Sequence, residues 1–81
     1  MRVTVLLFAR PRELAGTGRL ELDLPAGATA SDAFDVVAER APGLEAMRPV
    51  IRCAVGGEYA PWDTPLPDGT ELALIPPTSG G

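Results

Sequence analysis

The last six residues of this sequence are the ones best suited to chemistry. They read Pro76-Pro77-Thr78-Ser79-Gly80-Gly81. Proline favours an extended backbone and cannot donate a hydrogen bond to a β ladder, and glycine adds no side chain. We therefore expect a thin arm, about 20 Å long when fully extended, with the carboxylate of Gly81 at its end. An arm of this shape fits a narrow channel in a partner protein.

A carboxylate at the end of such an arm is not an electrophile until it is activated. Adenylation by ATP would supply a leaving group, and a sulfur or nitrogen nucleophile could then attack the acyl carbon. A β-branched residue would crowd that carbon, whereas Gly81 leaves it open. We expect Gly81 to be the reactive residue. The alternative is a frayed chain end without chemistry, which is common at termini.

Other kinds of active site are missing from the sequence. It contains no His, the commonest general base and metal ligand, and no metal-ligand cluster, phosphate-binding loop or nucleophile–base pair. The single Cys, Cys53, lies in an apolar segment, which predicts a buried and inert thiol. Trp62 lies among prolines and is expected to pack over the edge of the core. We expect no bound metal and no independent enzyme.

Composition limits the class of protein. The chain has 81 residues, of which 46% are hydrophobic and 22% charged, with a net charge of −4. These values are typical of one small globular domain, and the negative charge argues against binding nucleic acid. No apolar run reaches the roughly 18 residues that span a bilayer, and the start lacks the order of a signal peptide. A lone Cys fits a cytosolic chain, so we expect a cytoplasmic protein that binds neither nucleic acid nor a membrane.

The elements that must position the arm follow from the pattern of apolar residues. Strands are expected at residues 2–9, 19–24, 50–55, 58–60 and 71–75. The first is apolar almost throughout, which predicts a central strand buried on both faces beside a parallel neighbour. Pro11 is expected to end it, before one helical turn at residues 12–15 that Gly16 closes. The second strand alternates and predicts its antiparallel partner, and Gly56-Gly57 predicts a tight turn between the third and fourth.

One helix is expected between the second and third strands. The residues of its apolar face are Ala30, Ala33, Phe34, Val37, Ala38 and Ala41. Thr29 and Asp32 predict a capping box at its start, and Pro42-Gly43 predicts its end.

This order of elements predicts an α+β fold. A helix covers one face of a mixed sheet of about five strands when the first and last strands lie parallel at its centre. This arrangement is the β-grasp, or ubiquitin-like, fold. We expect a β-grasp domain at residues 1–75 and an extended tail at residues 76–81.

The sequence also resembles a known family from end to end. The matching stretches are Leu7-Phe8-Ala9, Arg12-Glu13-Leu14 with Gly16-Thr17, Ala54-Val55, Pro65-Leu66-Pro67-Asp68-Gly69-Thr70-Glu71, and Pro76-Pro77 before Gly80-Gly81. They resemble the molybdopterin synthase small subunit, the MoaD-type sulfur carriers. The chain departs from that family at Gly56-Gly57, where Asn is frequent, and at Thr78, where Val is frequent.

The resemblance implies a protein that acts as a reagent. An E1-like adenylyltransferase would activate the carboxylate of Gly81 with ATP, and a sulfur donor system would convert it into a thiocarboxylate. The tail would then enter the large subunit of the synthase, in a heterodimer or heterotetramer. There its sulfur would convert cyclic pyranopterin monophosphate into molybdopterin, with the catalytic groups on the large subunit. No cofactor would stay bound, because ATP is consumed by the activating partner.

Three residues are candidates for contact with a partner protein, and several alternative functions stay open. Phe8 and Ile75 are expected in a partner-binding patch unless both are buried in the sheet, and Arg12 could pair with a partner's acid unless it lies in a solvated turn. The alternatives in function are a carrier or modifier for thiamine synthesis, tRNA thiolation or protein conjugation. A β-grasp binding module with a silent terminus is the alternative from another class.

Overall fold

The computed structural model describes residues 1–77 of the chain. Along that range the elements are β1 (Arg2–Leu7), α1 (Ala9–Ala15), β2 (Arg19–Asp23), α2 (Ala30–Arg40), the 3-10 helix η1 (Glu45–Val50), β3 (Arg52–Val55), β4 (Glu58–Ala60) and β5 (Glu71–Ile75). No helix within residues 1–77 combines the length and the hydropathy that crossing a bilayer requires.

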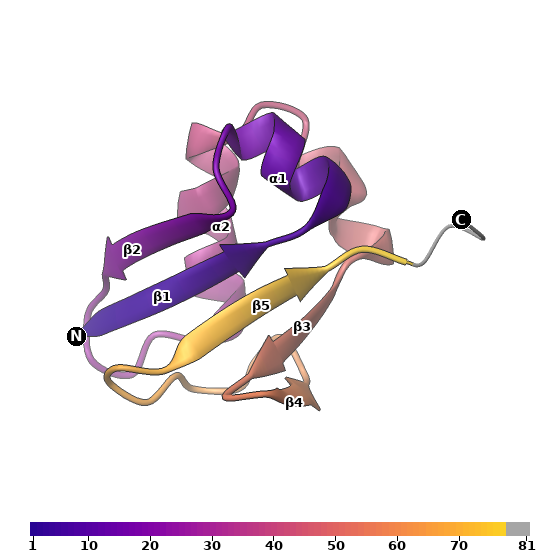
Figure 1. Ribbon diagram of the computed structural model, residues 1–81. Helices are drawn as coiled ribbons and strands as arrows, with labels where there is room; N and C mark the ends of the chain where they lie inside the picture. The colour runs from indigo at the N-terminus through magenta and orange to yellow at the C-terminus, as the bar shows by residue number, and fades with distance from the viewer. Residues whose placement is uncertain (78–81) are drawn as a thin grey trace.

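The five strands form one mixed sheet in the order β2-β1-β5-β3-β4. The central strands β1 and β5 are parallel, and every other neighbouring pair is antiparallel. Helix α2 covers one face of the sheet (Figure 1). The predicted β-grasp fold is therefore confirmed, including the parallel pair at its centre.

The core lies between this face of the sheet and α2. Its main members are Val3, Val5, Leu7, Leu22, Leu72 and Leu74 from the sheet and Ala30, Ala33, Phe34 and Val37 from α2. Phe34 is fully buried, and its ring meets that of Trp62 edge-on with the centroids 5.3 Å apart. Trp62 is partly buried against the core, which confirms its predicted place at the core edge.

Helix α2 begins where the sequence predicts. The Thr29 hydroxyl accepts the backbone N–H of Asp32 at 3.2 Å, and the Asp32 carboxylate accepts the backbone N–H of Thr29 at 2.9 Å. This reciprocal capping box satisfies two N–H groups that the first helical turn leaves without partners.

The corner between β1 and α1 differs from the prediction. Strand β1 ends at Leu7, and α1 already starts at Ala9 with Pro11 inside it. Proline is tolerated in the first turn of a helix because the N–H that it lacks would have no helical partner there. Pro11 therefore belongs to the helix and does not end the strand. Gly16 closes α1 with a φ of 76°, as predicted.

The prediction that β1 is buried on both faces was also wrong. Val3, Val5 and Leu7 are buried, whereas Thr4 and Leu6 on the other face are only half-buried. The helices cover one face of the sheet, so a central strand can have two hydrogen-bonded neighbours and still present one side to solvent.

Helix η1 was not predicted, and β3 starts at Arg52 instead of Val50. Arg48 holds η1 against α2. Its Nε lies 2.7 Å from Glu45 Oε2, its guanidinium also pairs with Asp35 on α2, and the same group lies 4.1 Å from the centroid of the Phe34 ring. The hydrogen bond from Arg48 lowers the pKa of the Glu45 carboxyl.

Candidate functional site at the end of the central strands

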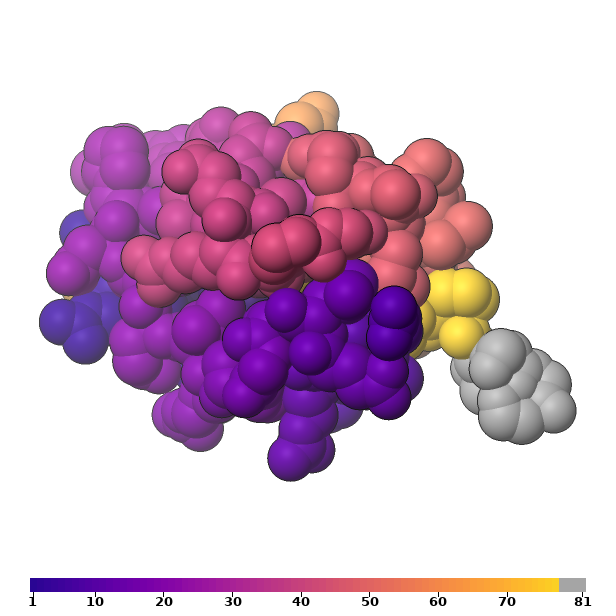
Figure 2. Space-filling view, turned by 90° about the horizontal axis from the view of Figure 1, so that it is seen from above, coloured from indigo at the N-terminus to yellow at the C-terminus, as the bar shows by residue number. Residues whose placement is uncertain are grey.

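The C-terminal tail leaves the sheet at the end where the parallel strands β1 and β5 both finish. We call the first two tail residues, Pro76 and Pro77, the root of the tail. Leu7 pairs with Leu74 in the register of these strands, and Phe8 and Ile75 are the next residues along the chain at this end of the sheet. Strand β3 runs antiparallel and places Arg52 opposite Ile75. In Figure 2 the yellow end of β5 lies next to the indigo corner between β1 and α1. Phe8, Ile75 and Arg52 thus surround the root of the tail.

Strand β5 ends at Ile75, as predicted, because Pro76 and Pro77 have no N–H to continue the ladder. Pro76 is half-buried and Pro77 is exposed. The remaining predicted site residues, Thr78, Ser79, Gly80 and Gly81, lie outside the described residues.

Phe8 is placed on the surface by an unusual backbone. Its side chain is 48% exposed, and the next residue, Ala9, has a φ of 53°. Within residues 1–77 Ala9 is the one residue other than glycine with a positive φ, a conformation that costs a residue with a Cβ about 1–2 kcal/mol. The strained corner turns the chain directly from β1 into α1 and leaves the aromatic ring outside the core.

The outer face of the sheet carries a row of apolar side chains that leads away from this corner. Leu6, Ala73, Ala54 and Tyr59 are aligned across β1, β5, β3 and β4. Tyr59 is 62% exposed, and the guanidinium of Arg52 lies 4.8 Å from the centroid of its ring. Sequence analysis did not single out Arg52 or Tyr59. The alternation of β3 and β4 about the Gly56-Gly57 turn is the signal that places both on the outer face.

Arg12 lies in α1, four residues after Phe8, and is exposed. Its guanidinium packs beside Gly18, where an added Cβ would lie 3.3 Å from Arg12 Nε. Its neighbour Glu13 pairs with Arg10 at 3.0 Å. Arg12 forms no ion pair with another residue up to Pro77, so its predicted role toward a partner stays a prediction.

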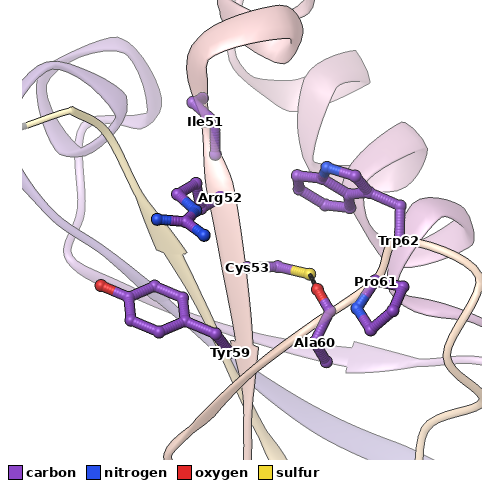
Figure 3. Close-up of a pocket in the computed structure, with 7 residues that line it drawn as sticks. All are labelled: Ile51, Arg52, Cys53, Tyr59, Ala60, Pro61 and Trp62. Atoms are coloured by element: carbon purple, nitrogen blue, oxygen red, sulfur yellow. Dashed lines mark hydrogen bonds between the residues drawn. The ribbon is translucent and has the colours of Figure 1, made fainter.

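A pocket of about 400 Å³ opens beside β3, where β3 and β4 separate after the Cys53–Ala60 pair. Figure 3 shows Arg52 and Tyr59 on one side of β3 and Cys53 and Trp62 on the other. Cys53 is buried, and its Sγ donates to the carbonyl oxygen of Ala60 at 3.1 Å. Burial raises the pKa of the Cys53 thiol. The predicted buried thiol is confirmed, and residues 1–77 contain no cluster of side chains that could hold a metal ion.

Comparison with known proteins gives a match over nearly the whole chain. The model of the ThiS family matches residues 5–81. A molybdopterin synthase sulfur carrier subunit of Arabidopsis thaliana is 40% identical over 81 residues, covering 100% of this chain and 84% of the relative. A protein of the same name from Drosophila erecta is 44% identical over 84 residues, covering 100% and 92%.

Solved structures share the fold at similar coverage. A putative molybdopterin converting factor, subunit 1, from Pyrococcus furiosus superposes with a TM-score of 0.85 at 31% identity, covering 96% of this chain and 99% of the other. The small archaeal modifier protein 1 of Haloferax volcanii also has a TM-score of 0.85 at 31% identity, covering 95% and 98%.

Proposed function

Because this chain belongs to the ThiS family, we propose that it is a sulfur carrier and serves as the small subunit of molybdopterin synthase. The observation that carries the proposal is the end-to-end similarity to relatives named molybdopterin synthase sulfur carrier subunit, at 40% and 44% identity. The position of the tail supports it, because Pro76 and Pro77 lead the chain away from the sheet at an exposed edge.

Gly81 is the residue that reacts. An E1-like adenylyltransferase joins its carboxylate to the AMP part of ATP and releases pyrophosphate. A persulfide of the donor system then attacks the acyl carbon, and AMP leaves. A thiol of the donor system attacks the resulting acyl disulfide, which releases the thiocarboxylate and leaves a disulfide on the donor. The glycine supports this role because it puts no side chain beside the carbon under attack.

The thiocarboxylate gives up its sulfur inside the large subunit. Two such transfers convert cyclic pyranopterin monophosphate into the dithiolene of molybdopterin, and each returns Gly81 as a carboxylate. The large subunit supplies the acids and bases. This division of labour is supported by a sequence that contains no His, the side chain that most often transfers protons near neutral pH.

The surface around the root of the tail docks the partner. Phe8 is nearly half exposed, and Ile75, at the same end of the sheet, is half-buried. Exposing the Phe8 ring to water and straining the backbone at Ala9 both cost free energy. Burial of the ring against another protein would recover part of that cost. Arg12, in the helix that follows, supplies a positive charge at the margin of the same surface.

The test is the intact mass of the chain after incubation with ATP, the E1-like enzyme and a sulfur donor. We expect a mass increase equal to one oxygen replaced by sulfur, located at Gly81 and absent when Gly81 is deleted. The deletion variant should unfold at the same urea concentration as the unaltered chain. If the chain stays unmodified while the enzyme loads a control carrier, this proposal is wrong. If the deletion variant keeps full function, the silent binding module is favoured.

Protein conjugation is a second candidate. The observation that favours it is the similarity to the small archaeal modifier protein 1. The activated Gly81 would then be captured by the amine of a lysine, which must belong to another protein because this chain has no Lys. Peptide mass spectrometry of cellular lysines would detect a remnant of the tail in an amide bond. Carriers for thiamine synthesis or tRNA thiolation use the same loading step and differ only in the acceptor.

A further inference from the structure

Arg52 and Tyr59 form a fixed unit on the outer face of the sheet. The guanidinium lies 4.8 Å from the centroid of the Tyr59 ring, a cation–π geometry that holds an otherwise flexible arginine in place. Both side chains are exposed, Tyr59 to 62%. Arg52 lies opposite Ile75 in the register of β3 and β5, so the unit is continuous with the surface around the root of the tail.

The charge of Arg52 has no partner among residues 1–77. Among residues 1–77, Arg2, Arg10, Arg19 and Arg48 each pair with a carboxylate, whereas Arg12, Arg40 and Arg52 do not. Of these three, Arg52 is the one that lies over an aromatic ring. The Tyr59 ring supplies one contact of the guanidinium, whose N–H groups can still donate hydrogen bonds to a partner. Such a group is oriented in advance for a carboxylate.

Arg52 is the one charged residue among those that line the pocket beside β3. It lies on the same side of β3 as Tyr59, whereas Pro61 and Trp62 lie on the other side (Figure 3). An acidic side chain whose carboxylate meets the guanidinium can pack its methylene groups on the exposed ring of Tyr59.

We propose that Arg52 and Tyr59 bind the carboxylate of an Asp or Glu side chain on the large subunit that receives the tail. The inference rests on the proposed function and names the chemistry of one contact within it. The positive charge of Arg52 favours an acidic side chain as its partner. The large subunit is the expected source of that side chain, because Arg52 lies opposite Ile75, the last residue of β5 just before the tail. For the same reason, this ion pair fixes the position from which the tail enters the large subunit.

The test compares binding of charge variants to the large subunit from the same organism by isothermal titration calorimetry at several salt concentrations. Arg52→Gln should weaken binding by about tenfold or more, as expected for a lost hydrogen bond to a charged group, and should reduce the salt dependence of Kd. Arg2→Gln is the matched control, since Arg2 lies at the opposite end of β1 and its ion pair with Asp23 is exposed. We expect this control to change Kd by less than about twofold.

Tyr59 is tested in the same assay. Tyr59→Phe keeps the ring and should bind like the unaltered chain, whereas Tyr59→Leu loses the cation–π contact and should weaken binding by a few fold. In the Arg52→Gln background Tyr59→Leu should have a smaller effect, because the two residues act through one contact.

Three results would overturn the inference. The first is an Arg52→Gln variant that binds as well as the unaltered chain. The second is an equal loss in the Arg52→Gln and Arg2→Gln variants, which would mean a general effect of charge. The third is a change in the NMR resonance of Arg52 Nε when the C-terminal carboxylate of the free chain is converted to an amide, because the chain's own terminal carboxylate would then occupy the site. A chain that becomes thiocarboxylated while Arg52→Gln binds normally refutes this contact and leaves the proposed function standing.

Discussion

Gly81 follows Ile75, the last residue of β5, by six positions in the sequence, so we expect a side chain added there to leave the core unchanged. We predict that Gly81→Val lowers the rate of thiocarboxylate formation by at least about tenfold, because a β-branched side chain crowds the acyl carbon. Intact mass over time measures the rate, and urea unfolding should show unchanged stability. Thr78→Val is the control, since it replaces one β-branched tail residue with another and should load normally. Equal rates for both variants would contradict the steric argument.

Cys53 is the only sulfur nucleophile in the sequence, yet its position argues against a part in sulfur transfer. The thiol is buried, bonded to the carbonyl oxygen of Ala60, and has a raised pKa, so it is seldom the reactive thiolate. We predict that Cys53→Ser loads Gly81 and forms molybdopterin as the unaltered chain does. A folded variant without transfer would give Cys53 a direct role.

The residues around the tail differ in how far the sequence predicts them. The expected reactivity of Gly81 rests on its place in the chain and stays a prediction, whereas the burial of Cys53 follows from the apolar residues around it. The Arg52–Tyr59 contact does not, because it depends on the exact approach of two strands and on one rotamer of a long side chain. Ala9 gives no warning of its positive φ, since alanine ordinarily avoids that region.

Helix α2 depends on one aromatic side chain. Phe34 is fully buried and packs against Trp62, so Phe34→Ala should lower the free energy of unfolding by about 3–5 kcal/mol. Urea denaturation followed by circular dichroism measures it. Glu39→Ala is the matched control on the exposed side of the same helix and should change stability by less than about 0.5 kcal/mol. A stable Phe34→Ala variant would show that the core does not rely on this ring.

Helix η1 depends on Arg48. This side chain is 26% exposed, pairs with Glu45 and Asp35, and lies over Phe34. Arg48→Ala should lower the free energy of unfolding by about 1–2 kcal/mol, through the lost cation–π contact and ion pairs. The exposed Arg40 on α2 gives the control variant Arg40→Ala, for which thermal unfolding should show little change. Equal losses in the two variants would mean that charge alone, and not this contact, is responsible.

The two helices show why elements are unequally predictable. Local signals specify α2, because Thr29, Asp32 and Pro42 mark its ends within the sequence itself. No capping residue marks the start of η1, and besides its local ion pair with Glu45, Arg48 holds this helix through Asp35 and Phe34 on another helix. The early start of α1 was missed for a related reason, since Pro11 is compatible with both a strand end and a first helical turn.

At the scale of the whole molecule the topology was predictable because few sheet arrangements suit this order of strands and one helix. The parallel pairing of β1 and β5 follows from that order, and so does the exit of the tail. The pocket beside β3 was not predictable, because it exists only where two strands separate and Trp62 closes one side. The sequence did not predict that one face of β1 is exposed, because an apolar strand is compatible with burial of one face or of both.

The stability of the whole domain should fall at alkaline pH through Cys53. Burial raises the pKa of its thiol in the folded state, so the fold holds this proton more tightly than the unfolded chain. The resulting stability is fully present below the unfolded pKa of about 8.5 and is lost as the pH rises through the folded value. Urea unfolding between pH 7 and 10 should show a smaller decline in Cys53→Ala than in the unaltered chain. Parallel declines would contradict this linkage.

The parallel arrangement of β1 and β5 also determines at which terminus a tag or label can be attached. The two strands start at one end of the sheet and finish at the other, so Met1 and the root of the tail lie at opposite ends (Figure 1). The Met1 nitrogen donates to the carbonyl oxygen of Leu24 at 2.8 Å, and a peptide N–H in its place can still donate. An affinity tag, a fluorophore or a solid support attached ahead of Met1 therefore leaves the end of the sheet from which the tail starts accessible. Any extension after Gly81 converts its carboxylate into a peptide bond.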